Sequence, residues 1–255
     1  MKYIVILGDG MSDEPMETLG GKTPLEVADI PTMDLLASQG EMGMVQNVPA
    51  GMSPGSDVAN LSVMGYDPKE SYSGRSPLEA LSLNIDMEPD DIVFRVNVVT
   101  LTEEEPYEEK TILDHSAGEI STADAKVLME AIQAEFNNEE FQFYPGTSYR
   151  HIMIWKKGRQ SKLAPPHDHL TQVIGPWLPE EKVLRDFMER SYPILNNHPL
   201  NVKRAADGKN KANSLWYWGA GTKPSLENFQ TKTGLKGAVV SAVDLLKGIA
   251  VGSGM

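Results

Sequence analysis

The apolar run from Tyr3 to Leu7 places the strongest constraint on how this chain of 255 residues can fold. No polar residue interrupts it, and it ends in Gly8-Asp9-Gly10. Such a run is typical of a parallel strand that is buried on both faces, which predicts an α/β sheet covered by helices. Ligands of such sheets bind at the carboxyl ends of the strands, so Asp9 is a candidate site residue. The alternative is that Asp9 is only a polar residue in a glycine turn.

Charge and composition exclude several classes of function. The 36 acidic residues outnumber the 23 lysines and arginines, and the formal net charge is −13. A nucleic-acid surface needs clustered lysine and arginine, so nucleic acid is not an expected partner, and an anionic ligand would need a local basic pocket. Cysteine is absent, which is compatible with a cytoplasmic location. No segment approaches the roughly 20 apolar residues of a membrane span, so we expect no membrane partner.

The order of the predicted elements changes in the middle of the chain. The first part alternates strands and short helices, with strands at 3–7 and 42–48, and strand followed by helix returns after residue 236. Between these parts the pattern favours an α+β arrangement, with a strand at 90–101, a helix at 122–136, two strands within 141–158 and a helix at 179–195. We therefore predict a core formed by residues 1–76 and 213–255, interrupted by an inserted α+β domain at 77–212.

Ser56 lies between Gly55 and Asp57, where a helix-like apolar run begins. Judged from these residues alone, the favoured interpretation is a helix cap, in which a side-chain oxygen accepts a free backbone N–H. The alternative is a nucleophile at a helix N-terminus, where N–H groups and the helix dipole favour negative charge. A similar capping pattern, Ser-Pro-Leu-Glu, predicts a helix that begins near Ser76.

Several basic residues are candidates for binding an anionic ligand. Arginine can hold a carboxylate or a phosphate through two parallel hydrogen bonds. Each candidate also has a structural interpretation, as a surface charge, a salt-bridge partner or a core residue. The candidates are Arg75, His115, Arg150, His151 and Lys211.

The sequence "PPHDHL" raises the question of a separate zinc site. His167 and His169 would share one face of a strand, but no cysteine or acidic cluster nearby completes a ligand set. The favoured interpretation is an ordered loop whose histidines face a substrate cleft.

Six motifs occur in order along the chain: "ILGDGMSD", "PGSDVANLSVMGYDP", "SGRSPLEA", "DHSAGEIST", "SYRHIMIW" and "KANSLWYWGAGTKPSL". Together they resemble the archaeal-type cofactor-independent phosphoglycerate mutases and their bacterial relatives proposed as homoserine kinases. The resemblance runs in order along essentially the whole chain. The family belongs to the alkaline phosphatase superfamily, in which a metal-binding α/β domain is interrupted by a second domain, and this agrees with the predicted insertion. The resemblance implies that residues 77–212 are an inserted substrate-binding domain.

The resemblance implies an isomerase of glycolysis and gluconeogenesis that interconverts 3-phosphoglycerate and 2-phosphoglycerate without bisphosphoglycerate. Ser56 would be transiently phosphorylated and would also bind metal, and Asp9 would be a metal ligand beside it. The implied cofactors are divalent ions, Mn²⁺ or Zn²⁺, two in the complete protein. Covalent transfer through a serine divides one difficult step into two easier ones.

The chain departs from this family at its end. Family members continue beyond the position of Met255, and the later segment carries the remaining metal ligands. We therefore expect either a fragment or a shortened relative, and no mutase turnover by residues 1–255 alone, because a two-metal site needs more ligands. Two alternatives stay open: a related phosphotransferase or phosphatase acting on another small metabolite such as homoserine phosphate, and a non-catalytic remnant. The oligomeric state is not predicted.

Overall fold

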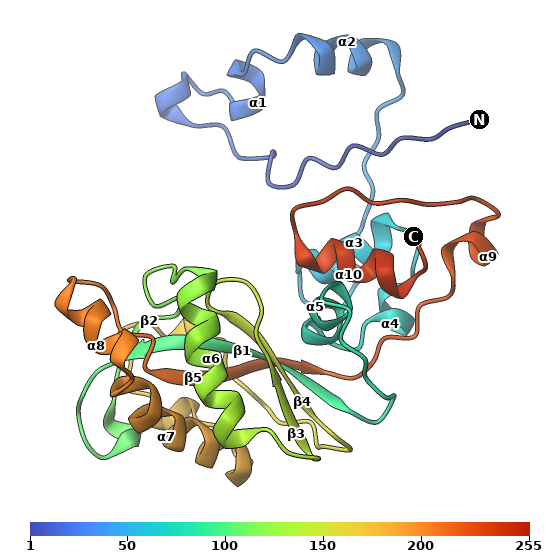
Figure 1. Ribbon diagram of the computed structural model, residues 1–255. Helices are drawn as coiled ribbons and strands as arrows, with labels where there is room; N and C mark the ends of the chain where they lie inside the picture. Colours follow the sequence, from blue (N-terminus) through green and yellow to red (C-terminus); the bar gives the residue numbers. More distant parts are fainter. The chain divides into compact units, whose positions relative to one another are not determined.

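The computed structural model describes residues 1–255, which form two structural units (Figure 1). Unit 1 comprises Met1–Gln46, and unit 2 comprises Asn47–Met255. None of the helices combines the length and the apolar character that crossing a lipid bilayer requires.

Unit 1 contains three short helices joined by extended chain: η1 (Glu17–Leu19), α1 (Pro24–Val27) and α2 (Pro31–Gln39). The Thr23 side chain accepts the N–H of Glu26, and the Glu26 carboxylate accepts the N–H of Thr23. This capping box stabilises the start of α1. No residue of unit 1 is buried, so local bonds of this kind hold its helices.

The two strands predicted in unit 1 are not formed. Residues 3–7 and 42–48 have no strand assignment, and Ile4 and Ile6 are 85% and 88% exposed. The prediction of strands in these two segments is therefore wrong for this structure. An apolar run becomes a strand only when a neighbouring segment accepts and donates its backbone hydrogen bonds, and neither run is a strand of the sheet.

Unit 2 is built on an antiparallel sheet of five strands, with the order β2-β1-β4-β3 and with β5 also paired to β1. The central strand β1 is buried along its whole length. The strands predicted at 90–101 and within 141–158 are confirmed. The strands are β1 (Ile92–Leu101), β2 (Ile112–Asp114), β3 (Phe141–Tyr144), β4 (Arg150–Trp155) and β5 (Ser214–Gly221).

Helices cover the two faces of this sheet. Phe94 packs in one hydrophobic cluster with residues of α6 (Thr122–Phe136) and α7 (Lys182–Asn196), which confirms the two longer predicted helices. Val93 packs in a separate cluster with Ala80 of α5 (Arg75–Ser82). Because successive strand residues point to opposite faces, α5 lies on the face opposite to α6 and α7.

Further helices pack beside α5 (Figure 1). Leu61 of α3, Leu78 of α5 and Leu245 of α10 share one apolar cluster. The approach of α10 to α5 is close enough that a Cβ on Gly248 would overlap the Leu78 carbonyl. The strand predicted after residue 236 is not formed, whereas the helix after it is. The remaining helices of unit 2 are α3 (Ser56–Val63), α4 (Pro68–Ser71), α8 (Pro199–Ala206), α9 (Phe229–Thr233) and α10 (Asp244–Gly252), with short 3-10 turns η2 (Tyr107–Glu109), η3 (Pro166–His169) and η4 (Gly175–Trp177).

Candidate functional site

A pocket in unit 2 gathers three arginines from three different elements. Arg75 comes from the start of α5, Arg95 from β1 and Arg150 from β4, and all three line the pocket. The start of α10 closes one side with Asp244. Three of the five predicted anion-binding candidates, Arg75, Arg150 and His151, therefore line this pocket. Arg95 joins them, although the sequence patterns did not single it out.

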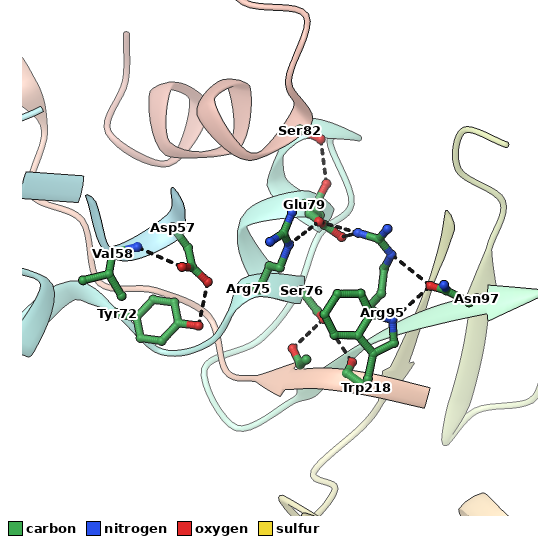
Figure 2. Close-up of polar contacts among 11 residues, drawn as sticks. Asp57, Val58, Tyr72, Arg75, Ser76, Glu79, Ser82, Arg95, Asn97 and Trp218 are labelled. Carbon is green, nitrogen blue, oxygen red and sulfur yellow. Dashed lines mark hydrogen bonds and ion pairs between the residues drawn. The ribbon is translucent and has the colours of Figure 1, made fainter. Parts of the chain in front are cut away.

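The pocket carries more positive than negative charge. The Glu79 carboxylate pairs with both Arg75, at 2.9 Å, and Arg95, at 2.5 Å, as Figure 2 shows. Arg150 forms no ion pair, and its buried Nε has no hydrogen-bond partner. Asp244 is already paired with a lysine outside the pocket, at 3.4 Å. Three guanidinium groups thus line one pocket, and the Glu79 carboxylate pairs with only two of them. In a chain whose formal charge is −13, this local excess of positive charge favours binding of an anion.

Close contact between α5 and β5 fixes the position of Arg75. Gly74 precedes the helix at a φ of 125°, and a Cβ there would lie 2.6 Å from the carbonyl oxygen of Ala220. The Ser76 hydroxyl donates to the Gly219 carbonyl at 2.5 Å (Figure 2). The predicted capping box at Ser76 is therefore wrong: α5 begins one residue earlier, because its first turn binds the strand.

Arg95 is held rigidly beneath this helix. Its Nε donates to Asn97 Oδ1 at 3.3 Å, and its guanidinium lies 5.1 Å from the ring of Trp218. Trp218 donates to the same Asn97 oxygen at 2.9 Å. Burial lowers the pKa of Arg95, and the charge of Glu79 opposes this shift. A buried guanidinium with fixed partners is well suited to recognise a planar or tetrahedral anion.

Arg150 and His151 are neighbours on β4, so their side chains point to opposite faces of the sheet. In the register of β1 and β4, Arg150 lies opposite Asn97, and His151 lies opposite Val96. Val96 belongs to the hydrophobic cluster beneath α6 and α7. The His151 Nδ1 accepts the N–H of Gly146 at 3.1 Å. Burial lowers the pKa of His151 to about 3, and Arg95 adds to the shift. His151 borders the pocket but supplies no charge to it at neutral pH.

His115 and His167 lie beside the arginines on the same side of the sheet. The His115 carbonyl accepts from Asn97 at 3.0 Å, and its ring lies 6.0 Å from that of His167. The rings of His167 and Trp218 are 5.2 Å apart, and the guanidinium of Arg75 lies 5.9 Å from Trp218. Sequence patterns alone did not bring these neighbours together, although Arg95, the one charged residue in a mostly apolar strand, was a usable signal.

Lys211 is not brought to this pocket. Its Nζ contacts Glu103 at 3.4 Å and the side chain of Asn196 at 3.1 Å, and its carbonyl accepts from Thr100. None of these partners lines the pocket.

Ser56 is the first residue of α3, and Gly55 is the N-cap. The Ser56 side chain is exposed and forms no capping hydrogen bond. Next to it, the buried Asp57 accepts from the Tyr72 hydroxyl at 2.8 Å and from the N–H of Val58 (Figure 2). The structure thus leaves the Ser56 hydroxyl free at a helix N-terminus, a position that favours phosphate.

Asp9 lies in unit 1, exposed within a turn, whereas Ser56 lies in unit 2. No group of three or more histidine, aspartate or glutamate side chains is arranged to hold a metal ion anywhere in residues 1–255. A two-metal centre needs a larger ligand set than Asp9 and Ser56 provide. The residues present therefore do not fit such a centre by themselves.

Comparison with known proteins connects this geometry to one family. A family profile described as "2,3-bisphosphoglycerate-independent phosphoglycerate mutase" matches residues 37–201. The "Probable 2,3-bisphosphoglycerate-independent phosphoglycerate mutase" of Geobacter sulfurreducens is 51% identical to the whole chain, and a Methanosarcina barkeri protein of the same name without the qualifier is 46% identical. The chain spans 64% of the length of each of these relatives.

Solved structures show the same likeness. The PH0037 protein from Pyrococcus horikoshii matches 96% of this chain with a TM-score of 0.72 and 30% identity, and 58% of that protein is covered. The cofactor-independent phosphoglycerate mutase from Thermoplasma acidophilum matches 96% of this chain with a TM-score of 0.55 and 28% identity, and 66% of it is covered.

Proposed function

Because the chain belongs to the 2,3-bisphosphoglycerate-independent phosphoglycerate mutase family, we propose that its arginine pocket binds phosphoglycerate for the interconversion of 3-phosphoglycerate and 2-phosphoglycerate. The family name describes a reaction that needs no bisphosphoglycerate. The observation that carries the proposal is the sharing of one carboxylate, Glu79, by Arg75 and Arg95, beside an unpaired Arg150. Phosphoglycerate carries a carboxylate and a phosphate, and both need cationic partners.

We further propose that Ser56 is the residue that receives the phosphoryl group. Its oxygen would attack phosphorus as the bond to the substrate oxygen breaks; the serine proton would pass to solvent, and the leaving oxygen of glycerate would take up a proton from solvent. The neighbouring hydroxyl of glycerate would then attack phosphorus and lose its proton to solvent, as the bond to the Ser56 oxygen breaks and that oxygen regains a proton. The exposed Ser56 hydroxyl and the N-terminus of α3 support this role, since free N–H groups there stabilise negative charge.

The cofactor proposal is divalent Mn²⁺ or Zn²⁺, with Asp9 and Ser56 as two of the ligands. When bound, such ions neutralise charge on a transferring phosphoryl group. Further ligands would have to come from outside residues 1–255, since no ligand cluster is present within them. We also propose residues 1–76 and 213–255 as parts of the metal-binding core and 77–212 as the inserted domain, with β5 pairing across that boundary, in a cytoplasmic glycolytic enzyme.

Binding to the arginine pocket is tested by titrating 3-phosphoglycerate into the 255-residue chain in a calorimeter. Arg150→Gln should weaken binding by about 1.5–3 kcal/mol, roughly ten- to a hundredfold, because a charge-assisted hydrogen bond is lost. Arg190→Gln is the matched control, since Arg190 pairs with Glu135 on the surface. Equal affinity of the two variants would refute the assignment of the pocket.

Catalysis is tested in a fusion that joins these 255 residues to the remaining part of the Geobacter sulfurreducens relative. The fusion should interconvert the two phosphoglycerates in the presence of Mn²⁺. With substrate that carries a labelled phosphate, the label should appear on Ser56. Ser56→Ala should remove both turnover and label, whereas Ser53→Ala, three residues earlier, should remove neither. Turnover by the Ser56→Ala fusion would refute the phosphoserine.

A further inference from the structure

We propose that His167 binds the phosphate of the substrate in a second anion subsite beside the arginines, and that it takes up a proton from solvent as the phosphate dianion binds. This inference rests on the proposed function, because it assigns the place of one group of the same substrate.

The first support is a continuous row of contacts that connects His167 to the arginines. Arg75 lies over Trp218, at 5.9 Å, and His167 meets the edge of Trp218, at 5.2 Å. From His167 the row continues through His115, at 6.0 Å, to Tyr149, at 5.7 Å. The guanidinium of Arg150 lies 5.7 Å from the Tyr149 ring and closes the row. A ligand with two anionic groups can therefore bind arginine at one group and histidine at the other.

The second support is that the ring nitrogens of His167 are free to bind a ligand. Its ring forms no hydrogen bond within the chain, and its only ion-pair partner is Asp168, at 3.7 Å. Its side chain is 45% exposed, so a ligand can reach it. His169, two residues later, is different: it stacks on Trp177, at 3.7 Å, and contacts Gln172.

The third support is the charge around His167. Partial burial lowers the pKa of His167, Asp168 opposes this shift, and the charges of His115, Arg75 and Arg95 lower it further. These residues come from η3, the loop after β2, α5 and β1. Trp218 of β5 also contacts the ring but carries no charge. His167 is therefore mainly neutral near pH 7 in the free protein. A bound dianion reverses the local charge and stabilises the imidazolium.

The test is calorimetry of the 255-residue chain at about pH 7 in buffers that differ in ionisation enthalpy. The second pKa of a phosphate ester is near 6, so a ligand that loses its residual proton on binding releases protons. Uptake has the opposite sign and identifies a protein group. We expect net uptake with 3-phosphoglycerate and with glycerol 3-phosphate, and none with glycerate, which lacks the phosphate.

His167→Gln should abolish proton uptake and weaken 3-phosphoglycerate binding about tenfold, because one charge-assisted bond is lost. His169→Gln is the matched control and should retain both. In NMR spectra, the His167 ring signals, assigned by their absence in His167→Gln, should titrate at a higher pH when ligand is bound. Binding with the same proton uptake in His167→Gln, or with none in the unchanged protein, would overturn this inference and leave the arginine pocket standing. Failure of all three ligands to bind would overturn the proposed function as well.

Discussion

Replacing Glu79 by glutamine is expected to destabilise the protein and to increase the stabilisation that it gains from a bound anion. Glu79 is the only carboxylate paired with Arg95, and the two side chains are 11% and 6% exposed. Removing one partner of a buried pair costs about 3–5 kcal/mol, because the other charge stays buried without compensation. Arg75 adds little to this cost, since its side chain is 36% exposed and solvent screens it.

The lower end of this range applies to Glu79→Gln. The glutamine keeps a carbonyl oxygen as an acceptor, and Arg95 keeps its contacts with Asn97 and Trp218. We therefore expect a loss of about 3 kcal/mol, which lowers the melting temperature by roughly 6–12 °C in a unit of this size. Phosphate or 3-phosphoglycerate should restore more of the melting temperature in this variant than in the unchanged protein, because a bound anion replaces the lost charge.

Differential scanning calorimetry with and without 3-phosphoglycerate measures both effects. Glu135→Gln is the matched control, because Glu135 and its partner Arg190 are 51% and 55% exposed. Exposed pairs contribute about 0–1 kcal/mol, so the control should melt close to the unchanged protein. If Glu79→Gln melted with the control and responded to the ligand no more strongly, the argument that Glu79 compensates a buried arginine would be refuted.

Three further predictions concern single residues. Ser56→Ala should change the free energy of unfolding by less than about 1 kcal/mol in urea titrations, because Gly55 is the N-cap of α3; a larger loss would mean that the hydroxyl is structural. Gly74→Ala should lower the melting temperature, because the residue has a φ of 125° and no room for a Cβ, and an unchanged melt would contradict the described contact with β5. Burial opposes ionisation of Asp91, but hydrogen bonds from Lys156 and two backbone N–H groups outweigh it and lower the pKa of Asp91. The stabilisation by the ionised Asp91 carboxylate is therefore present above the unfolded pKa of about 3.9 and is lost as pH falls through the folded pKa. Asp91→Asn should lower the free energy of unfolding by about 2 kcal/mol at neutral pH and by less in acid. A loss independent of pH would contradict this role of the carboxylate.

Local sequence patterns predicted the elements whose stability is mostly local or whose partners are close in sequence. The helix at 122–136 and the hairpin within 141–158 are of this kind. The run at 3–7 has the composition of a buried strand, but composition cannot supply the neighbouring strand that its hydrogen bonds require. The start of α5 was misplaced by one residue, because contact with β5, far along the chain, decides where the helix begins.

In the candidate site, too, local sequence patterns predicted some features, and contacts between distant segments decided the others. Alternation along a strand determines that Arg150 and His151 point to opposite faces, but not which face holds the pocket. That depends on α5 packing against β1, which also brings Glu79 to Arg95. His167 was predicted to lie in an ordered loop, and its contact with Trp218 became visible only from the fold.

The tight contacts on both sides of α5 have a consequence for the entropy of ligand binding. Gly74 holds the helix against β5, and Gly248 holds α10 against it, in both cases through backbone contact without intervening side chains. The helix therefore has little freedom to slide or tilt, and the spacing between Arg75 and Arg95 is set before any ligand arrives. Ordering these groups is a cost met during folding, so more of the interaction free energy with an anion is expressed as affinity.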